Sequence, residues 1–165
     1  MGRTSRSPIV TEASPTVLLE DLAATRALGT RLAAAVAGGD VIALSGPLGA
    51  GKSELARALI RARAGAAIEV PSPSYTLVQD YPVGELVLRH IDLYRLADPG
   101  ELREIGLEAP EADEVWLVEW PERAGDMFLQ DLQITLEQGP AADGRIAHLR
   151  AGPRWQKRLD ALLDD

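Results

Sequence analysis

The stretch that most constrains the fold runs from residue 40 to residue 59 and reads DVIALSGPLGAGKSELARAL. An apolar run at 41–44 stops at Ser45, and three glycines then fall within six residues, followed by a lysine and a hydroxyl. Residues 46–53 match the motif G-x-x-x-x-G-K-[ST] without a mismatch, between an expected strand at 40–45 and an expected helix at about 52–63. This order of strand, loop and helix predicts a nucleotide triphosphate site.

Each part of the motif has a task in holding phosphate. Glycines let successive backbone N–H groups approach phosphate oxygens, and the helix N-terminus adds unpaired N–H groups and partial positive charge. We expect Lys52 to reach the β- and γ-phosphates and the Ser53 hydroxyl to ligate Mg²⁺. The loop residues predicted to bind the nucleotide are Gly46, Leu48, Gly49, Ala50, Gly51, Lys52, Ser53 and Glu54.

Two acids stand at the ends of further expected strands. Glu119 closes the apolar run VWLV, and Asp92 closes LVLRHI. In an open α/β sheet such strand ends meet at the carboxyl edge, near the nucleotide. P-loop proteins need acids there to complete Mg²⁺ coordination and to orient the attacking group. We predict Lys52, Asp92 and Glu119 as the catalytic residues, with Ser53 and Glu119 on the metal and Asp92 on the water. The residue pattern leaves the reverse assignment of the two acids open.

The remaining segments are typical of one α/β domain. Residues 15–165 are predicted to form it, and residues 1–14 a disordered lead-in. We expect a three-layer fold of the P-loop NTPase kind, whose mostly parallel central sheet carries additional antiparallel strands. The other expected elements are an edge strand at 17–19, a helix at 22–36, a hairpin of 75–81 with 85–91, a short helix capped by Asp98, a strand at 114–120, a second hairpin of 132–138 with 145–151 and a closing helix at 153–163.

Charge and composition narrow the function classes. The net charge of −8 argues against unaided binding to nucleic acid, because phosphate neutralisation supplies most non-specific affinity. The absence of cysteine excludes disulfides, thiolate metal sites and a cysteine nucleophile. No apolar run approaches the ~20 residues that span a bilayer, and the N-terminus lacks an apolar signal-peptide core. We therefore expect a cytoplasmic protein without membrane contact.

The class of nucleotide follows from motifs that are missing. Guanine-reading GTPases use N-K-x-D, but this sequence contains no asparagine and no D-x-x-G, so ATP is the expected nucleotide. A small-molecule kinase remains an alternative, with the segment LYRLADPGELREIG as a small lid. A nucleotide-switched binding module, whose hydrolysis is incidental, is a third hypothesis.

Three further motifs follow the P-loop in order: SPSYTLV at 72–78, HIDLYRL at 90–96 and VEWPER at 118–123. Together with GPLGAGKS they resemble the TsaE family of bacterial ATPases, which serve the synthesis of N6-threonylcarbamoyladenosine in tRNA. The resemblance extends from about residue 16 to about residue 160. It implies a P-loop α/β fold, MgATP as ligand, slow ATP hydrolysis and action with the TsaB and TsaD proteins. Contact with tRNA is then expected only through that complex.

The resemblance also implies roles for single residues. The family segment S-P-T-[FY]-T-L-V behaves like a switch loop near the γ-phosphate, so Ser74 and Thr76 are predicted to bind there. The motif E-W-P-E begins at Glu119, and we expect Trp120 beside the nucleotide, stacked on a base or a partner. Ser53 and Ser74 replace threonines and keep the hydroxyl, whereas Glu54 replaces a frequent threonine and brings charge beside the nucleotide.

The arginines and histidines of the sequence say less about the functional site. Arg95 and Arg123 lie beside the two acidic motifs, and either can pair with a nearby carboxylate instead of phosphate. Because P-loop hydrolases without a positioned arginine are slow, we expect weak activity alone and partners that complete the site. His90 and His148 have no companions at metal-ligand spacing, and we assign both a structural role.

Overall fold

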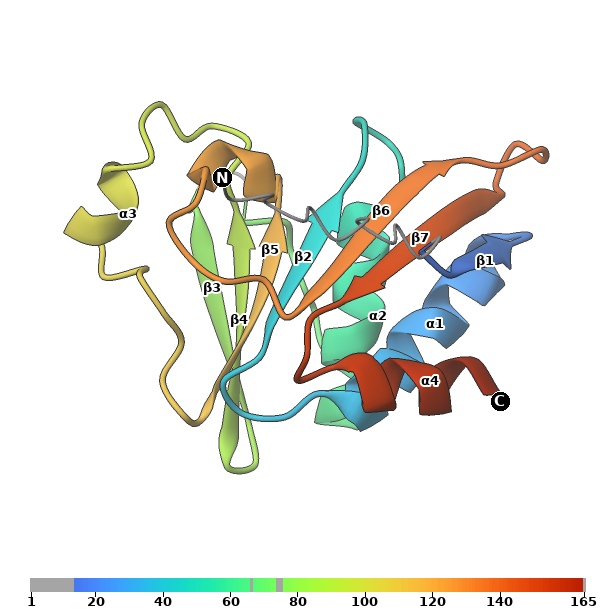
Figure 1. Ribbon diagram of the computed structural model, residues 1–165, viewed down its shortest axis with the longest axis horizontal. Helices are drawn as coiled ribbons and strands as arrows, with labels where there is room; N and C mark the ends of the chain where they lie inside the picture. The colour runs from blue at the N-terminus through green and yellow to red at the C-terminus, as the bar shows by residue number, and fades with distance from the viewer. Residues whose placement is uncertain (1–13, 66, 74–75, 165) are drawn as a thin grey trace, which may run out of the picture.

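Figure 1 shows a computed structural model of the chain, which describes residues 14–65, 67–73 and 76–164. The described residues form one seven-stranded sheet in the order β1-β7-β6-β2-β5-β4-β3. Its strands are β1 (Thr16–Leu19), β2 (Val41–Ser45), β3 (Val78–Val83), β4 (Leu86–Asp92), β5 (Glu114–Glu119), β6 (Leu132–Gln138) and β7 (Arg145–Ala151). The helices are α1 (Leu22–Ala35), α2 (Lys52–Ala64), the single-turn α3 (Glu101–Glu104), the 3-10 helix η1 (Pro121–Ala124) and α4 (Gln156–Asp164).

The centre of the sheet is parallel and its margins are antiparallel. Strand β2 pairs in parallel with β5 on one side and β6 on the other, and β4 pairs in parallel with β5. The hairpins β3–β4 and β6–β7 add antiparallel strands outside this centre, and β1 pairs with β7 at the edge. The predicted α/β class, with a mostly parallel centre and added hairpins, is confirmed.

Apolar side chains alternate between the two faces of the central strands. On β5, Val115 and Leu117 belong to a cluster with residues of α1, α2 and α4, whereas Trp116 and Val118 belong to a second cluster. The second cluster also contains Leu102 of α3 and Ala124 of η1, on the opposite face (Figure 1). Both faces are therefore covered, as parallel strands require.

The first hairpin differs from its prediction. The strand β3 begins at Val78 rather than residue 75 and continues through Pro82 and Val83, so the turn falls at Gly84 and Glu85. Pro82 has no N–H to donate, and β3 tolerates it because β3 is the edge strand of the sheet. Tyr75, at the expected start of this strand, lies outside the described residues.

The ends of other elements also shift. The helix α3 begins at Glu101, three residues after the predicted cap, because Asp98 and Pro99 lie in the turn before it. Asp98 Oδ1 still accepts a hydrogen bond from the Gly100 N–H, at 2.8 Å. Of the predicted lead-in, residues 1–13 lie outside the described part of the chain. Among the described helices, none combines the length and the apolar character needed to cross a membrane.

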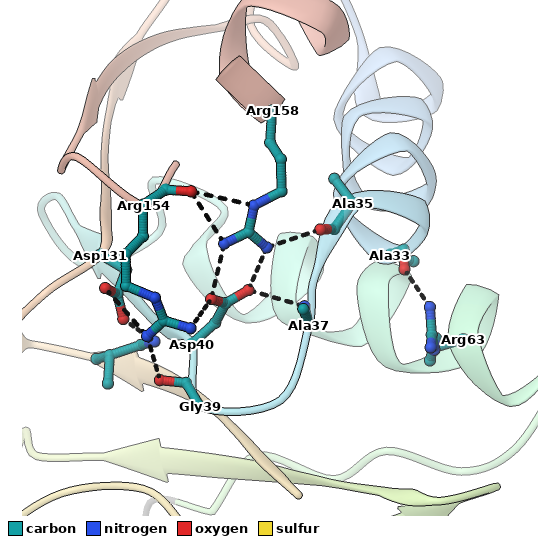
Figure 2. A network of polar contacts seen from close by, with 10 residues as sticks. Ala33, Ala35, Ala37, Gly39, Asp40, Arg63, Asp131, Arg154 and Arg158 are labelled. Carbon is teal, nitrogen blue, oxygen red and sulfur yellow. Dashed lines mark hydrogen bonds and ion pairs between the residues drawn. The ribbon is translucent and has the colours of Figure 1, made fainter. Parts of the chain in front are cut away.

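A buried carboxylate joins the C-terminal helix to the start of β2 (Figure 2). Asp40 is 0% exposed and accepts hydrogen bonds from Arg158 Nη1 at 2.6 Å, Arg158 Nη2 at 2.9 Å and the Ala37 N–H at 2.8 Å. Arg158 Nη1 also donates to the carbonyl of Ala35, the last residue of α1, at 2.9 Å. One guanidinium thus connects α1, β2 and α4, at the end of β2 opposite the glycine loop.

Replacing Asp40 tests this connection. We expect Asp40→Ala to lower the free energy of unfolding by about 3–5 kcal/mol, because it leaves the Arg158 guanidinium without its buried partner. Arg154→Ala is the matched control, since Arg154 is 54% exposed and lies 3.5 Å from the same carboxylate. The control substitution is expected to lower the free energy of unfolding by no more than about 1 kcal/mol. Chemical denaturation measures both, and equal losses would show that the network is not centred on the Asp40–Arg158 pair.

Candidate functional site

The glycine loop leaves β2 at Ser45 and enters α2 at Lys52. Gly46 has φ +140°, and a Cβ there would lie 2.4 Å from the Leu136 carbonyl oxygen of β6, so only glycine fits. Gly51, directly before the helix, has φ +102°, which side-chain-bearing residues rarely adopt. Between them the Ala50 N–H donates to the Pro47 carbonyl at 3.1 Å and closes a turn. The motif therefore forms the compact loop at a helix N-terminus that phosphate binding requires.

Lys52 lies inside this loop. Its Nζ donates to the carbonyls of Gly46 at 2.5 Å and Pro47 at 2.9 Å, and it lies 4.1 Å from the centroid of the Trp120 ring. Burial has the largest effect on Lys52 and lowers its pKa below the usual value, and the negative charges of Glu119, Glu122 and Asp92 offset only part of this effect. The surrounding carbonyls, carboxylates and indole face favour an ammonium, so a cation stands where a phosphate would enter.

The two predicted acids meet at the same edge of the sheet. In the parallel register Glu119 is level with Leu44 of β2 on one side and with Asp92 of β4 on the other. Ser53 Oγ, in the first turn of α2, donates to Glu119 Oε1 at 2.8 Å. Asp92 Oδ1 accepts from the Tyr94 N–H at 3.0 Å. The structure thus brings Ser53, Glu119 and Asp92 beside the loop, as expected from the strand ends.

These groups line a cleft of about 330 Å³. Its lining includes the two acids, Ser72 and Tyr94, the glycine loop, and Leu22 and Thr25 of α1. Its described lining is Leu22, Thr25, Leu48, Gly49, Ala50, Gly51, Lys52, Ser53, Glu54, Arg57, Ser72, Asp92, Tyr94, Glu119, Trp120, Asp143 and Arg145. All predicted nucleotide-binding residues of the loop except Gly46 belong to this lining, and Gly46 begins the loop.

The predicted switch segment is placed only in part. Ser74 lies outside the described residues. Thr76 is exposed in a turn where its N–H donates to the Pro73 carbonyl at 3.1 Å, and it is not in the described lining of the cleft. Leu77 follows with φ +68°, and its carbonyl accepts from the Asp92 N–H at 2.9 Å. The described part of the segment therefore meets the site at two places, through Ser72 in the lining of the cleft and through the Leu77 carbonyl beside Asp92.

Trp120 and Glu54 both line the cleft. Trp120 has the left-handed backbone of φ +59°, rare for a residue with a side chain, and its ring lies 5.1 Å from that of Tyr94 at the mouth of the cleft. Glu54 forms ion pairs with Arg57 at 3.1 Å and Arg26 at 3.8 Å. The carboxylate that replaces a threonine is therefore balanced by two guanidinium groups.

His90, for which a structural role is expected from the sequence, lies against a predicted metal ligand. Its Nε2 lies 2.6 Å from Glu119 Oε2, and the imidazole is 0% exposed. A carboxylate is an acceptor, so Nε2 carries the proton in this contact. The available signal was spacing, because His90 stands two residues before Asp92 and shares its face of the strand. Thr25, Asp143 and Arg145 were also missed, and no local pattern connects them with the loop.

The site suits magnesium better than a protein-only metal cage. Within the described residues, no group of three or more histidine, aspartate or glutamate side chains is placed to hold a metal. Mg²⁺ usually binds one or two carboxylates and completes its octahedron with phosphate oxygens and water. The adjacent Ser53 hydroxyl and Glu119 carboxylate fit that mode of binding.

Comparisons with known proteins agree with this geometry. A family model described as threonylcarbamoyl adenosine biosynthesis protein TsaE matches residues 19–146. The tRNA threonylcarbamoyladenosine biosynthesis protein TsaE of Rickettsia felis is 34% identical over 161 residues, which cover 90% of this chain and 94% of that protein. The protein of the same name from Haemophilus influenzae is 42% identical over 120 residues, which cover 72% of this chain and 75% of that protein. The crystal structure of Bacillus subtilis YdiB superposes with a TM-score of 0.72 at 27% identity, and the match covers 92% of this chain and 95% of that one.

The contact between His90 and Glu119 yields a stability prediction. His90→Leu removes the Nε2 donor and leaves a buried carboxylate oxygen unsatisfied, so we expect the free energy of unfolding to fall by about 1–3 kcal/mol. His90→Gln retains an N–H donor and is expected to recover part of the loss. His148→Leu, at a half-buried histidine on β7, is the control and should change stability by no more than about 0.5 kcal/mol. Equal losses in His90→Gln and His90→Leu would argue against the hydrogen bond.

Proposed function

The chain belongs to the TsaE family, and on that basis we propose that it is a MgATP-binding P-loop ATPase serving N6-threonylcarbamoyladenosine formation in tRNA. The observation that carries the proposal is the convergence of Lys52, Ser53, Glu119 and Asp92 around one glycine loop. The printed names of the Rickettsia felis and Haemophilus influenzae relatives support the part in tRNA modification. Because tRNA is modified in the cytoplasm, we propose that the protein acts there.

The two ends of the cleft suggest how ATP would lie. The acids that act on the terminal phosphate stand at the β4–β5 end, so the γ-phosphate would face Asp92 and Glu119. The α- and β-phosphates would then lie over the loop, and the nucleoside would extend towards α1 and the β6–β7 loop. Leu22 and Thr25 of α1 and Asp143 of the β6–β7 loop belong to the lining of the cleft. This part offers both apolar and polar contacts, which a nucleoside requires.

Each residue of the loop end then has a chemical task. Lys52 would leave the Gly46 and Pro47 carbonyls and donate to the β- and γ-phosphates. Ser53 and Glu119 would hold Mg²⁺, which neutralises charge on the transferring phosphoryl group. Asp92, level with Glu119 on the next strand, would orient the attacking water. His90 would hold the second oxygen of Glu119 and keep the first one directed at Ser53.

The described part of the cleft contains no arginine free to act on the γ-phosphate. Its two arginines are Arg57, which donates to Glu54 and to the Val70 carbonyl, and Arg145, which donates to loop carbonyls. Arg123 faces Tyr94, with its guanidinium carbon 5.9 Å from the ring centroid. Stabilisation of the transition state by arginine is therefore incomplete, and this supports slow hydrolysis by the isolated protein.

The mouth of the cleft presents surface to a partner. Leu48 is 69% exposed at the tip of the loop, and Tyr94 is 38% exposed beside Trp120. We propose that TsaB and TsaD act with this chain and complete or gate the site, with tRNA reached only through that complex. The segment considered as a kinase lid is docked instead, because its residues Leu93, Leu96 and Leu102 are buried in the second apolar cluster. No observation favours the kinase.

Lysine replacement tests nucleotide binding. The sequence has two lysines, so Lys157→Ala, at an exposed position of α4, is a matched control for Lys52→Ala. We expect Lys52→Ala to weaken MgATP binding about 10- to 100-fold, through the loss of charge-assisted hydrogen bonds to phosphate. Lys157→Ala should bind as the unchanged protein does. Titration calorimetry measures both, and unaltered binding in Lys52→Ala would contradict a phosphate site in this loop.

The partner requirement is tested by ADP release at fixed MgATP, with and without stoichiometric TsaB and TsaD. We expect a strong increase with the partners, since an arginine supplied in trans to other P-loop hydrolases raises the rate about 10³- to 10⁵-fold. Fast turnover by the chain alone would contradict the proposal. A rate that ignores the partners but rises with a small-molecule acceptor would identify a kinase instead.

Asp92→Asn distinguishes a loss of ATP hydrolysis from a loss of ATP binding. We expect ATP affinity within about twofold of the unchanged protein and hydrolysis reduced about 10²- to 10⁴-fold, because the amide cannot accept a proton from water. Binding is measured by calorimetry and hydrolysis by ADP release in the presence of the partners. If Mg²⁺-dependent binding falls as well, the two acids exchange roles and Asp92 is the metal-side acid.

A further inference from the structure

Arg145 is the first residue of β7 and reaches the glycine loop from the far end of the chain. Its Nε donates to the Ala50 carbonyl at 3.0 Å, and its Nη2 donates to the Gly49 carbonyl at 3.0 Å. Its Nη1 donates to the carbonyls of Ala142 at 3.1 Å and Gly144 at 2.7 Å, in the loop between β6 and β7. A single guanidinium therefore bridges two loops that are 95 residues apart in the chain.

We infer that Arg145 is a positioning residue that holds the glycine loop in its phosphate-binding conformation. The inference rests on the proposed nucleotide function of the loop. It assigns Arg145 no contact with the phosphates and places its action on the loop backbone.

The geometry of the peptide bond explains how such contacts act. The described residues contain no cis peptide, so each carbonyl points opposite to the N–H of the following residue. A hydrogen bond on the Ala50 carbonyl fixes the direction of the Gly51 N–H, directly before the helix that supplies Lys52. The bond on the Gly49 carbonyl fixes the peptide whose N–H closes the turn with Pro47. Arg145 thus sets two consecutive peptide planes in the middle of the loop.

The hydrogen-bond inventory of the guanidinium argues against a direct phosphate contact. Arginine has five N–H donors, and four of them are used on the carbonyls of Gly49, Ala50, Ala142 and Gly144. The remaining donor cannot form the two-pronged contact through which arginine binds phosphate. No ion pair within 4.0 Å found among the described residues includes Arg145, and its hydrogen-bond partners there are backbone carbonyls.

The β6–β7 loop, which directly precedes Arg145, is itself held by hydrogen bonds. Gln138 Nε2, at the end of β6, donates to the carbonyls of Ala141 at 2.9 Å, Ala142 at 3.2 Å and Gly144 at 3.2 Å. Two of these carbonyls also accept from Arg145. The β6–β7 loop is therefore ordered by side chains from both of its strands, which gives the guanidinium a defined position against the glycine loop.

Three variants separate positioning from charge and from packing. Arg145→Met removes the guanidinium, Arg145→Lys keeps the charge but cannot reach two carbonyls as a planar fork, and Arg150→Met changes an exposed arginine on the same strand. We expect Arg145→Met and Arg145→Lys to weaken binding of MgADP and of magnesium tripolyphosphate by the same factor. That factor is about tenfold if the competent loop conformation falls to about a tenth of the population. Arg150→Met should leave both affinities unchanged.

Hydrogen exchange provides a readout that needs no ligand. In the nucleotide-free protein, the amides of residues 46–53 should exchange faster in both Arg145 variants than in the unchanged protein and in Arg150→Met. Exchange in β2 and β5 should stay unchanged, which shows that the variants are folded. Arg145→Lys is the milder change and stays informative if Arg145→Met does not fold.

Four outcomes overturn the inference. Unchanged loop exchange in both Arg145 variants shows that Arg145 does not hold the loop. Wild-type affinity in Arg145→Lys shows that charge alone is sufficient. A loss for MgADP but not for tripolyphosphate makes Arg145 a nucleoside contact. A wild-type MgADP affinity in both variants also excludes the positioning role. If the unchanged protein binds neither ligand, the proposed function fails, and the exchange experiment still decides whether Arg145 orders the loop.

Discussion

Parallel pairing of β2, β5 and β4 is the constraint on which the site depends. Because the three strands run in the same direction, their carboxyl ends share one edge, and Leu44, Glu119 and Asp92 stand level in the register. A slip of β5 by one residue would turn Glu119 to the opposite face and take it away from Ser53. Apolar clusters on both faces of the sheet oppose such a slip. The packing of the core therefore sets the distances within the site.

Two arginines from the C-terminal part of the chain secure the two ends of β2. At its start, Arg158 of α4 binds the buried carboxylate of Asp40 (Figure 2). Beyond its end, Arg145 of β7 binds carbonyls of the glycine loop. Both contacts join segments about 100 residues apart, and both use several of the five N–H donors of an arginine guanidinium group. The antiparallel hairpin and the last helix thus hold both ends of the strand that leads into the glycine loop.

The site that we propose to bind ATP contains few groups for rapid hydrolysis. Lys52, Ser53 and the two acids surround the loop, but the arginines of the described cleft donate to carbonyls and to Glu54. The left-handed backbone of Leu77 and Trp120 adds local strain on either side of Asp92 and Glu119. Such strain persists only where surrounding packing enforces it, and here it flanks the end of the cleft proposed for the γ-phosphate. This arrangement is consistent with a site completed by a partner.

The sequence by itself determined the glycine loop between β2 and α2, the two strand-end acids and the α/β class. These depend on short-range patterns: residues 46–53 need particular backbone angles, and apolar runs ending in Asp92 and Glu119 indicate buried strands. The turn of the first hairpin was misplaced, because an edge strand tolerates the proline that was expected to end it. The start of α3 was also misplaced, because a turn precedes the first helical residue. Only the tertiary structure decided that His90 touches Glu119 and that Arg145 reaches the loop. These contacts join distant segments through single side chains. The spacing of His90 from Asp92 indicates that they share a strand face, but it does not indicate which buried or distant partner a histidine or an arginine will meet.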